Sequence, residues 1–142
     1  MRFLYLSPAA RHALLGLRAL ALAQGHGPFS PSGASARKGA LPANTLSKVF
    51  QRLARRGLLT ARRGPGGGYA LARPAAEISL AEILRAVQDI VPGGHHCLLG
   101  NRLCSEGVFC PVHRVINWAD RLVIAAFEAL TLQDLADSEG WT

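Results

Sequence analysis

Residues 41–69 read LPANTLSKVFQRLARRGLLTARRGPGGGY, and this stretch decides the fold. Between residues 41 and 56, apolar side chains recur at the spacing of one face of a helix, which predicts an amphipathic helix. Residues 58–63 and 68–72 have the pattern of two short strands, and the glycine-rich turn 64–67 between them predicts a hairpin. A helix followed by a basic hairpin is the order of a winged-helix unit.

The charge distribution indicates a polyanionic partner for this part of the chain. The formal net charge of the 142 residues is +7. Residues 1–74 contain 12 Lys and Arg and no Asp or Glu, whereas residues 75–142 contain 4 basic and 9 acidic residues. Clustered positive charge repels itself unless a polyanion relieves it. We therefore expect the first half of the chain to bind double-stranded DNA.

The polar and basic residues of the predicted helix and hairpin divide into two expected roles. The residues near the start of the helix are expected to contact base edges: Asn44, Thr45 and Lys48. The basic residues further along are expected to contact phosphates: Arg52, Arg55, Arg62 and Arg63. Gly66 and Gly67 give the tip of the wing its backbone freedom. An ordinary solvated helix face is the alternative, but it does not explain the absence of acidic residues.

Length and composition indicate one compact domain rather than an assembly of several. Hydrophobic residues make up 49% of the chain and charged residues 18%, which suits a packed core and not a disordered segment. The apolar run 13–23 is interrupted by Arg18 and is too short to span a membrane. We expect a cytoplasmic protein without membrane contact. The sequence shows no catalytic triad and no Walker-type phosphate loop, so we do not expect an enzyme.

Further helices are expected on both sides of the helix–hairpin stretch. Ser7 and Pro8 have the pattern of an N-cap and a first helical residue, and Gly25 and Gly27 would end that helix. The Pro-, Gly- and Ser-rich residues 28–40 support at most one short helix near 34–38. The capping-box spacing of Ser79 and Glu82 predicts a helix over about 79–90.

The last third of the chain predicts one long helix and one short helix. Helical periodicity extends over residues 111–130 and is broad enough for packing against two partners, and Thr131 caps the short helix that follows. We interpret Tyr69 and Trp118 as core aromatic residues. The predicted architecture is mainly α with a small β-hairpin wing and a long C-terminal helix.

Three cysteines lie within fourteen residues: Cys97, Cys104 and Cys110, and His113 follows the last of them. Three thiolates and an imidazole can complete either an iron–sulfur cluster or a tetrahedral zinc site. The cysteines are further apart than the close pairs typical of structural zinc, which favours a cluster. Burial of the cysteines as small apolar residues is a further interpretation.

These features together resemble the bacterial winged-helix regulators that include the iron–sulfur regulator IscR and the nitric-oxide sensor NsrR. The resemblance rests on the wing tip RGPGGGY (63–69), the capped ISLAEI (78–83), the three cysteines and TLQDL (131–135). It implies a homodimeric transcription regulator whose helix 111–130 pairs across the dimer and whose cluster, held by Cys97, Cys104, Cys110 and His113, tunes binding to a palindromic operator. A 2Fe-2S cluster is favoured by the resemblance, and a 4Fe-4S cluster is the alternative.

The resemblance divides the chain into three parts. Residues 1–91 form the winged-helix DNA-binding domain, residues 92–110 the cluster-binding loop, and residues 111–142 the dimerisation and C-terminal helices. In some relatives the fourth ligand comes instead from the partner's first helix, which points to the neighbourhood of His12. The signal sensed would be redox state, nitric oxide or iron supply.

Two other functions stay open on the sequence alone. The first is a winged-helix regulator whose cysteines bind structural zinc or form a thiol–disulfide switch. The second, from another class, is a small iron–sulfur electron-transfer protein that docks an acidic partner with its basic half.

Overall fold

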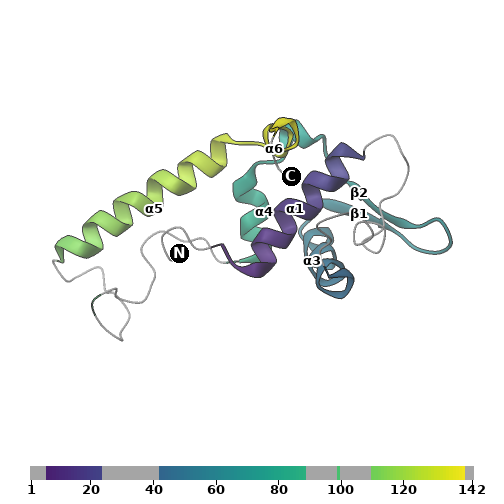
Figure 1. Ribbon diagram of the computed structural model, residues 1–142, viewed down its shortest axis with the longest axis horizontal. Coiled ribbons are helices and arrows are strands. Elements are labelled where there is room, and N and C mark those ends of the chain that lie inside the picture. The colour runs from purple at the N-terminus through teal and green to yellow at the C-terminus, as the bar shows by residue number, and fades with distance from the viewer. Residues whose placement is uncertain (1–5, 24–41, 89–98, 100–109, 140–142) are drawn as a thin grey trace.

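The computed structural model describes residues 6–23, 42–88, 99 and 110–139. Its elements, in chain order, are α1 (Pro8–Leu22), α3 (Ala43–Arg55), β1 (Leu59–Arg62), β2 (Gly68–Leu71), the 3-10 turn η1 (Ala75–Glu77), α4 (Leu80–Val87), α5 (Pro111–Ala129) and α6 (Leu132–Asp137). Figure 1 shows a body formed by α1, α3, α4 and α6, with the hairpin extending from one end and α5 projecting from the other. The described part of the chain is mainly helical with one small hairpin, as the sequence predicts.

The core of the body forms where α1 crosses α3. A Cβ atom on Gly16 would lie 2.7 Å from Cδ1 of Leu46 and 2.8 Å from Cε1 of Phe50, so glycine allows this close approach. The ring of Phe50 then meets Tyr69 of β2 edge to face, with the ring centroids 5.3 Å apart. The predicted apolar stripe of α3 is buried as expected: Leu46, Val49, Phe50 and Leu53. These contacts fix α3 against both α1 and the hairpin.

The hairpin is a regular antiparallel pair. Leu59 lies opposite Leu71, and Arg62 lies opposite Gly68. At the turn, Gly64 and Gly66 have φ angles of 95° and 73°, which other residues rarely adopt. A Cβ on Gly67 would collide with the carbonyl oxygen of Arg62. The strands are slightly shorter than the predicted 58–63 and 68–72, and the glycines of the predicted tip are needed for the turn.

Two capping boxes start α4 and α6 side by side. Glu82 N–H donates to Oγ of Ser79 (3.1 Å) while Ser79 N–H donates to a carboxylate oxygen of Glu82 (2.9 Å). Thr131 and Asp134 form the same arrangement at α6. An antiparallel bridge pairs Ser79 with Thr131. The bond from the Ser79 backbone, with the nearby Arg73 guanidinium, lowers the pKa of Glu82 despite partial burial. Both caps agree with the sequence prediction.

The helix predicted over 79–90 is shorter than expected, because α4 ends at Val87. Gln88 has an extended backbone with φ −149° and ψ 158°. Its side-chain Oε1 accepts a hydrogen bond from the backbone N–H of Ser7 over 2.9 Å. The residue thus leaves the helix and caps the start of α1 instead. The predicted stops at Gly25 and Gly27 and the short helix near 34–38 lie outside the described residues, and α1 ends at Leu22.

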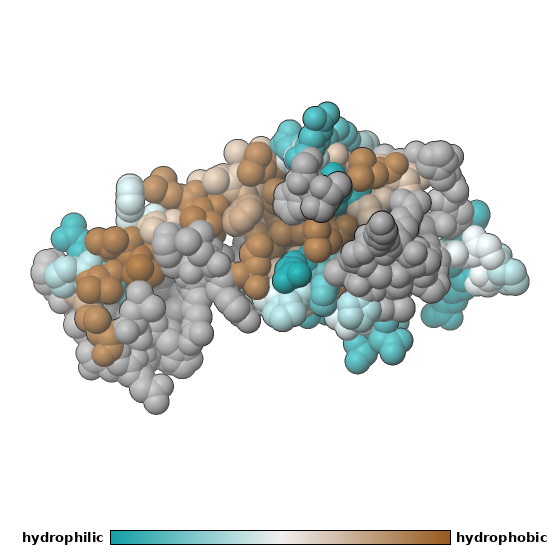
Figure 2. All heavy atoms as spheres, in the orientation of Figure 1, coloured by the Kyte–Doolittle hydropathy of each residue, from teal (hydrophilic) through white to brown (hydrophobic). Residues whose placement is uncertain are grey.

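The long helix α5 is confirmed, but the interpretation of Trp118 as a core residue is wrong. Trp118 is 65% exposed, whereas Tyr69 is partly buried against the core as predicted. Only Asp120 and Ile124 of α5 are buried. The helix therefore buries few of its side chains and leaves apolar residues such as Val115, Trp118 and Leu122 exposed, and Figure 2 shows hydrophobic atoms along it. Among the described helices, none has the length and apolar character needed to cross a membrane.

Candidate functional site

The basic residues predicted for DNA contact lie exposed on α3 and the hairpin. This group comprises Lys48, Arg52, Arg55, Arg62 and Arg63. No ion pair or hydrogen bond links their charged groups to another described residue. By contrast, Arg73 pairs with Glu82 at 2.7 Å and Arg85 pairs with Glu128 at 2.5 Å. Within the described residues, the arginines that form ion pairs are Arg73 and Arg85, which lie beside or in α4. The basic residues of α3 and the hairpin form none, so their charges can interact with an anionic ligand.

The N-terminal end of α3 also suits an anionic ligand. Pro42 is the N-cap and makes no side-chain cap bond, and the first turn contains no acidic residue. Asn44 is exposed and Thr45 is partly exposed in this turn. The first backbone N–H groups of a helix and its dipole attract phosphate oxygens. The structure brings Asn44, Thr45 and Lys48 onto the first two turns of one helix, next to the hairpin that carries Gly66 and Gly67.

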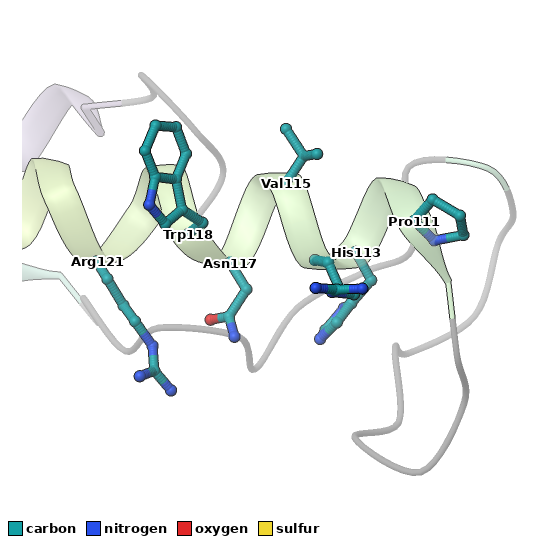
Figure 3. A pocket seen from close by; sticks show the side chains of 7 residues that line it. Pro111, His113, Val115, Asn117, Trp118 and Arg121 are labelled. Carbon is teal, nitrogen blue, oxygen red and sulfur yellow. The ribbon is translucent and has the colours of Figure 1, made fainter.

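Cys110 and His113 lie one helical turn apart at the start of α5. Cys110 is the N-cap, partly buried and without a disulfide. Figure 3 shows His113, Asn117 and Arg121 on the same side of α5, with Val115 and Trp118 on the other. Residues of both sides line an open hollow of about 660 Å³. A thiol and an imidazole at this spacing can approach one metal centre.

The surroundings of His113 are compatible with a ligand role. The Oδ1 atom of Asn117, one turn further along α5, is buried and has no hydrogen-bond partner among the described residues. Metal-ligating histidines usually donate their second ring N–H to a carboxylate, a backbone carbonyl or water, and an amide oxygen is able to accept the same bond. Cys97 and Cys104 lie outside the described residues, so the structure does not test their approach to Cys110. Within the described part of the chain, no group of three or more possible ligands is gathered.

The weaker candidate ligand, His12, lies in α1 and is partly buried. Its Nδ1 atom is buried and has no hydrogen-bond partner in the described part of the chain. A buried ring nitrogen normally finds a partner. His12 therefore keeps its place as an alternative ligand.

Two polar residues with structural importance were not singled out from the sequence. Asp120 is 1% exposed, and neither carboxylate oxygen has a partner among the described residues. Burial raises the pKa of this carboxyl. Arg18 donates hydrogen bonds to the carbonyl oxygens of Leu135 and Ser138, each over 3.0 Å, and so holds the end of α6 against α1. Each is a charged residue close to apolar positions of an amphipathic helix, a pattern that does not by itself distinguish a buried charge from an exposed one.

Comparison with known proteins places the chain in a family. The family model of Rrf2, described as "Iron-dependent Transcriptional regulator", matches residues 6–138. The chain belongs to the Rrf2 family. The transcriptional regulator IscR of Photorhabdus laumondii is 29% identical over 134 residues, which cover 94% of this chain and 80% of that protein.

Solved structures of Rrf2-type regulators have the same fold. The cysteine regulator CymR of B. subtilis has a TM-score of 0.79 at 23% identity, covering 96% of this chain and 99% of that one. IscR of T. potens has a TM-score of 0.75 at 22% identity, covering 97% and 95%. The predicted winged-helix fold is therefore confirmed, with α3 followed by the β1–β2 hairpin. Rrf2 proteins are transcriptional regulators that bind DNA, and this chain is a member of that class.

Proposed function

We propose that this Rrf2 protein is a homodimeric regulator whose binding to a palindromic operator depends on an iron–sulfur cluster. The observation that carries the DNA-binding part is the set of exposed cations on α3 and the wing, which have no ion pair with another described residue. In this proposal α3 enters the major groove with Asn44, Thr45 and Lys48 at base edges. The phosphate contacts come from Arg52, Arg55, Arg62 and Arg63, and Gly66 and Gly67 bring the wing backbone close to the DNA. Such a regulator works in the cytoplasm.

The uncovered face of α5 supports dimerisation. Val115, Trp118 and Leu122 recur at helical spacing and are 61%, 65% and 51% exposed. A contiguous apolar helix face of this kind is typical of an interface. We assign residues 111–142 to dimerisation, residues 1–91 to DNA binding, and residues 92–110 to the loop between them. Two copies paired through α5 would present two recognition helices to the two half-sites.

Cys97, Cys104, Cys110 and His113 would hold the cluster, with His12 as the alternative to His113. Support comes from the placement of Cys110 and His113 on one turn of α5 and from the similarity to IscR. When bound, the cluster supplies a centre that responds to redox state, nitric oxide or iron supply. The chain's own part would be to hold and orient the ligands, and Asn117, on the same side of α5 as His113, would orient its imidazole. A 2Fe-2S centre is favoured over 4Fe-4S.

A second candidate keeps DNA binding but replaces the cluster with thiol chemistry or structural zinc. It is favoured by the likeness to CymR, described as a global cysteine regulator, and by the free, partly exposed thiol of Cys110. The electron-transfer alternative has no comparable support, since α3 and the hairpin form a winged-helix unit in a family of regulators.

Anaerobic purification followed by absorbance, iron and sulfide analysis separates these candidates. The proposal requires a coloured protein, and alanine at Cys97, Cys104 or Cys110 should bleach it. His113→Ala should shift the spectrum or the reduction potential. His26, which has no cysteine near it in the sequence, serves as the control, and His26→Ala should change neither. A colourless protein with stoichiometric zinc would rule out the cluster. A colourless, metal-free protein whose thiols oxidise reversibly would favour the thiol switch.

A further inference from the structure

Helix α5 is joined to the body through its C-terminal end. Directly after α5, the carbonyl oxygen of Leu130 accepts a hydrogen bond from the N–H of Leu80 over 2.9 Å. The N–H of Leu132 donates to the carbonyl oxygen of Ile78 over 2.8 Å, and an antiparallel bridge lies between the two bonds. The chain that follows α5 is thus bound to the chain that precedes α4. Figure 1 shows α5 projecting away from this junction.

The apolar contact between α5 and the body does not fix the direction of the helix strongly. Of the residues of α5, all of which the structure describes, only Asp120 and Ile124 are buried. Val123 and Phe127 pack against the core but are only partly buried. The carboxylate of Asp120 has no hydrogen-bond partner among the described residues, so its burial opposes the contact rather than strengthening it. The direction of α5 therefore depends on further contacts near the junction.

An ion pair between α4 and the last turn of α5 supplies such a contact. A guanidinium nitrogen of Arg85 lies 2.5 Å from a carboxylate oxygen of Glu128, and both side chains are about half exposed. An exposed ion pair changes an equilibrium constant by up to about fivefold. Loss of the pair therefore leaves the protein folded, but it changes the direction that α5 prefers relative to α4.

Small changes in this direction have large effects along the helix. The 19 residues of α5 span about 28 Å. Over that length, a rotation of about 7° displaces one end by about 3.4 Å, the distance between successive base pairs. The exposed Val115 and Trp118, proposed as dimer contacts, lie in the N-terminal half of α5, and Glu128 lies near its other end. The ion pair is thus placed between the dimer contacts and the DNA-binding body.

We propose that the Arg85–Glu128 ion pair sets the spacing between the two half-sites that the dimer accepts on DNA. This inference rests on the proposed homodimer and palindromic operator, and it names the residues that determine one feature of that operator. Two recognition helices must lie about one turn of DNA, roughly 34 Å, or a multiple of it apart. Because α5 connects each body to the dimer contacts, the angle between them determines this separation. Arg85 and Glu128 act as positioning residues and make no contact with DNA.

The test uses the full chain and a duplex that it selects from a random-sequence pool. The two half-sites of this duplex are then separated by the selected spacer, or by one base pair more or fewer, and affinity is measured by fluorescence anisotropy. The wild type should prefer one spacing by about tenfold or more. Arg85→Ala and Glu128→Ala should each reduce this preference by about threefold or more, because the dimer contains the pair twice. Both should bind a single half-site within about twofold of the wild type.

The charge-exchanged variant Arg85→Glu/Glu128→Arg should recover the preference for one spacing. Arg73→Ala is the matched control, because the ion pair of Arg73 with Glu82 has similar length and exposure but joins two residues of the body. It should keep the wild-type preference.

Three results would overturn the role of the ion pair and leave the proposed function standing. They are an unchanged spacing preference in Arg85→Ala and Glu128→Ala, a loss that charge exchange does not recover, and equal losses of affinity for single and paired half-sites. A wild-type protein that selects no paired half-sites would instead overturn the proposed homodimer on a palindromic operator.

Discussion

The backbone N–H of Ser7 donates a hydrogen bond to Oε1 of Gln88 over 2.9 Å, which joins the first turn of α1 to the residue that ends α4. Gln88 directly precedes the segment that contains Cys97 and Cys104. Helix α1 in turn packs on α3, where Gly16 lies against Leu46 and Phe50. A rearrangement of the cysteine segment can therefore reach the recognition helix through α1.

Gln88→Ala should weaken this connection. In the wild type we expect cluster loss to change operator affinity by about 5- to 150-fold, the usual size of such coupling. The variant should show a markedly smaller ratio of affinities between the cluster-containing and cluster-free forms, with about 1 kcal/mol less stability. Gln133→Ala, which removes an exposed glutamine bond in α6, is the control and should leave the ratio unchanged. A wild-type ratio in Gln88→Ala would refute the route through α1.

Gly16→Val should destabilise the body, because the larger side chain would push α1 away from α3. The first added carbon would already lie 2.7 Å from Leu46 and 2.8 Å from Phe50, both fully buried. Overpacking of this kind costs about 1–3 kcal/mol. That cost outweighs the few tenths of a kcal/mol by which valine exceeds glycine in helix propensity. Urea denaturation followed by circular dichroism measures the loss, with the exposed Arg11→Ala as a control that should stay close to wild type.

Asp120→Asn should stabilise the protein at neutral pH and not in acid. Burial without a described partner raises the pKa of Asp120 above its ordinary 3.8. The folded state therefore disfavours the carboxylate, and wild-type stability is lost as pH rises from 3.8 through the raised folded-state pKa. The variant should be more stable by about 1 kcal/mol at pH 7, a difference that should vanish below about pH 3.8. Urea titrations of the metal-free proteins at both pH values decide this, and a variant less stable at pH 7 would reveal a partner for the carboxylate.

Much of the fold could be predicted because it follows local rules. The caps at Ser7, Ser79 and Thr131 and the apolar stripe of α3 depend on residues close in sequence, and each is present in the structure. The early end of α4 could not be predicted, because the side chain of Gln88 accepts a hydrogen bond from Ser7, which lies 81 positions away in the sequence. The fit of Gly16 against α3 is likewise a tertiary contact between separate segments.

The site was predicted less completely than the fold. That Arg62 and its neighbours have no ion pair with another described residue could be learned only from the structure, in which Glu82 and Glu128 pair with Arg73 and Arg85. Trp118 was misinterpreted because an apolar helix face has the same pattern whether it meets its own core or another molecule. The proposed ligands Cys97 and Cys104 lie outside the described residues, and their spacing is the sequence signal on which the proposal of a ligand set rests.

The two proposed classes of DNA contact should respond differently to salt. Arg62→Ala or Arg63→Ala should flatten the fall of log affinity with log salt by about 0.9 for each phosphate that the variant no longer binds, with little change in sequence preference. Asn44→Ala or Lys48→Ala should relax preference at particular base pairs by about 1–3 kcal/mol. Anisotropy titrations at several salt concentrations, with the selected duplex and single-base variants, measure both effects. If all four variants weaken cognate and random DNA equally, α3 does not read bases.

In the proposed function, a cluster held between the DNA-binding region and the dimerisation helix controls specific DNA binding. The most direct measurement is the affinity of cluster-containing and cluster-free protein for the selected duplex and for a scrambled duplex, at one salt concentration. We expect the two forms to differ on the selected duplex by about 5- to 150-fold. On the scrambled duplex they should differ little, because phosphate attraction survives a misplaced recognition helix. Equal affinities of the two forms for the selected duplex would contradict the claim and leave a DNA-binding protein whose cysteine segment is not a sensor.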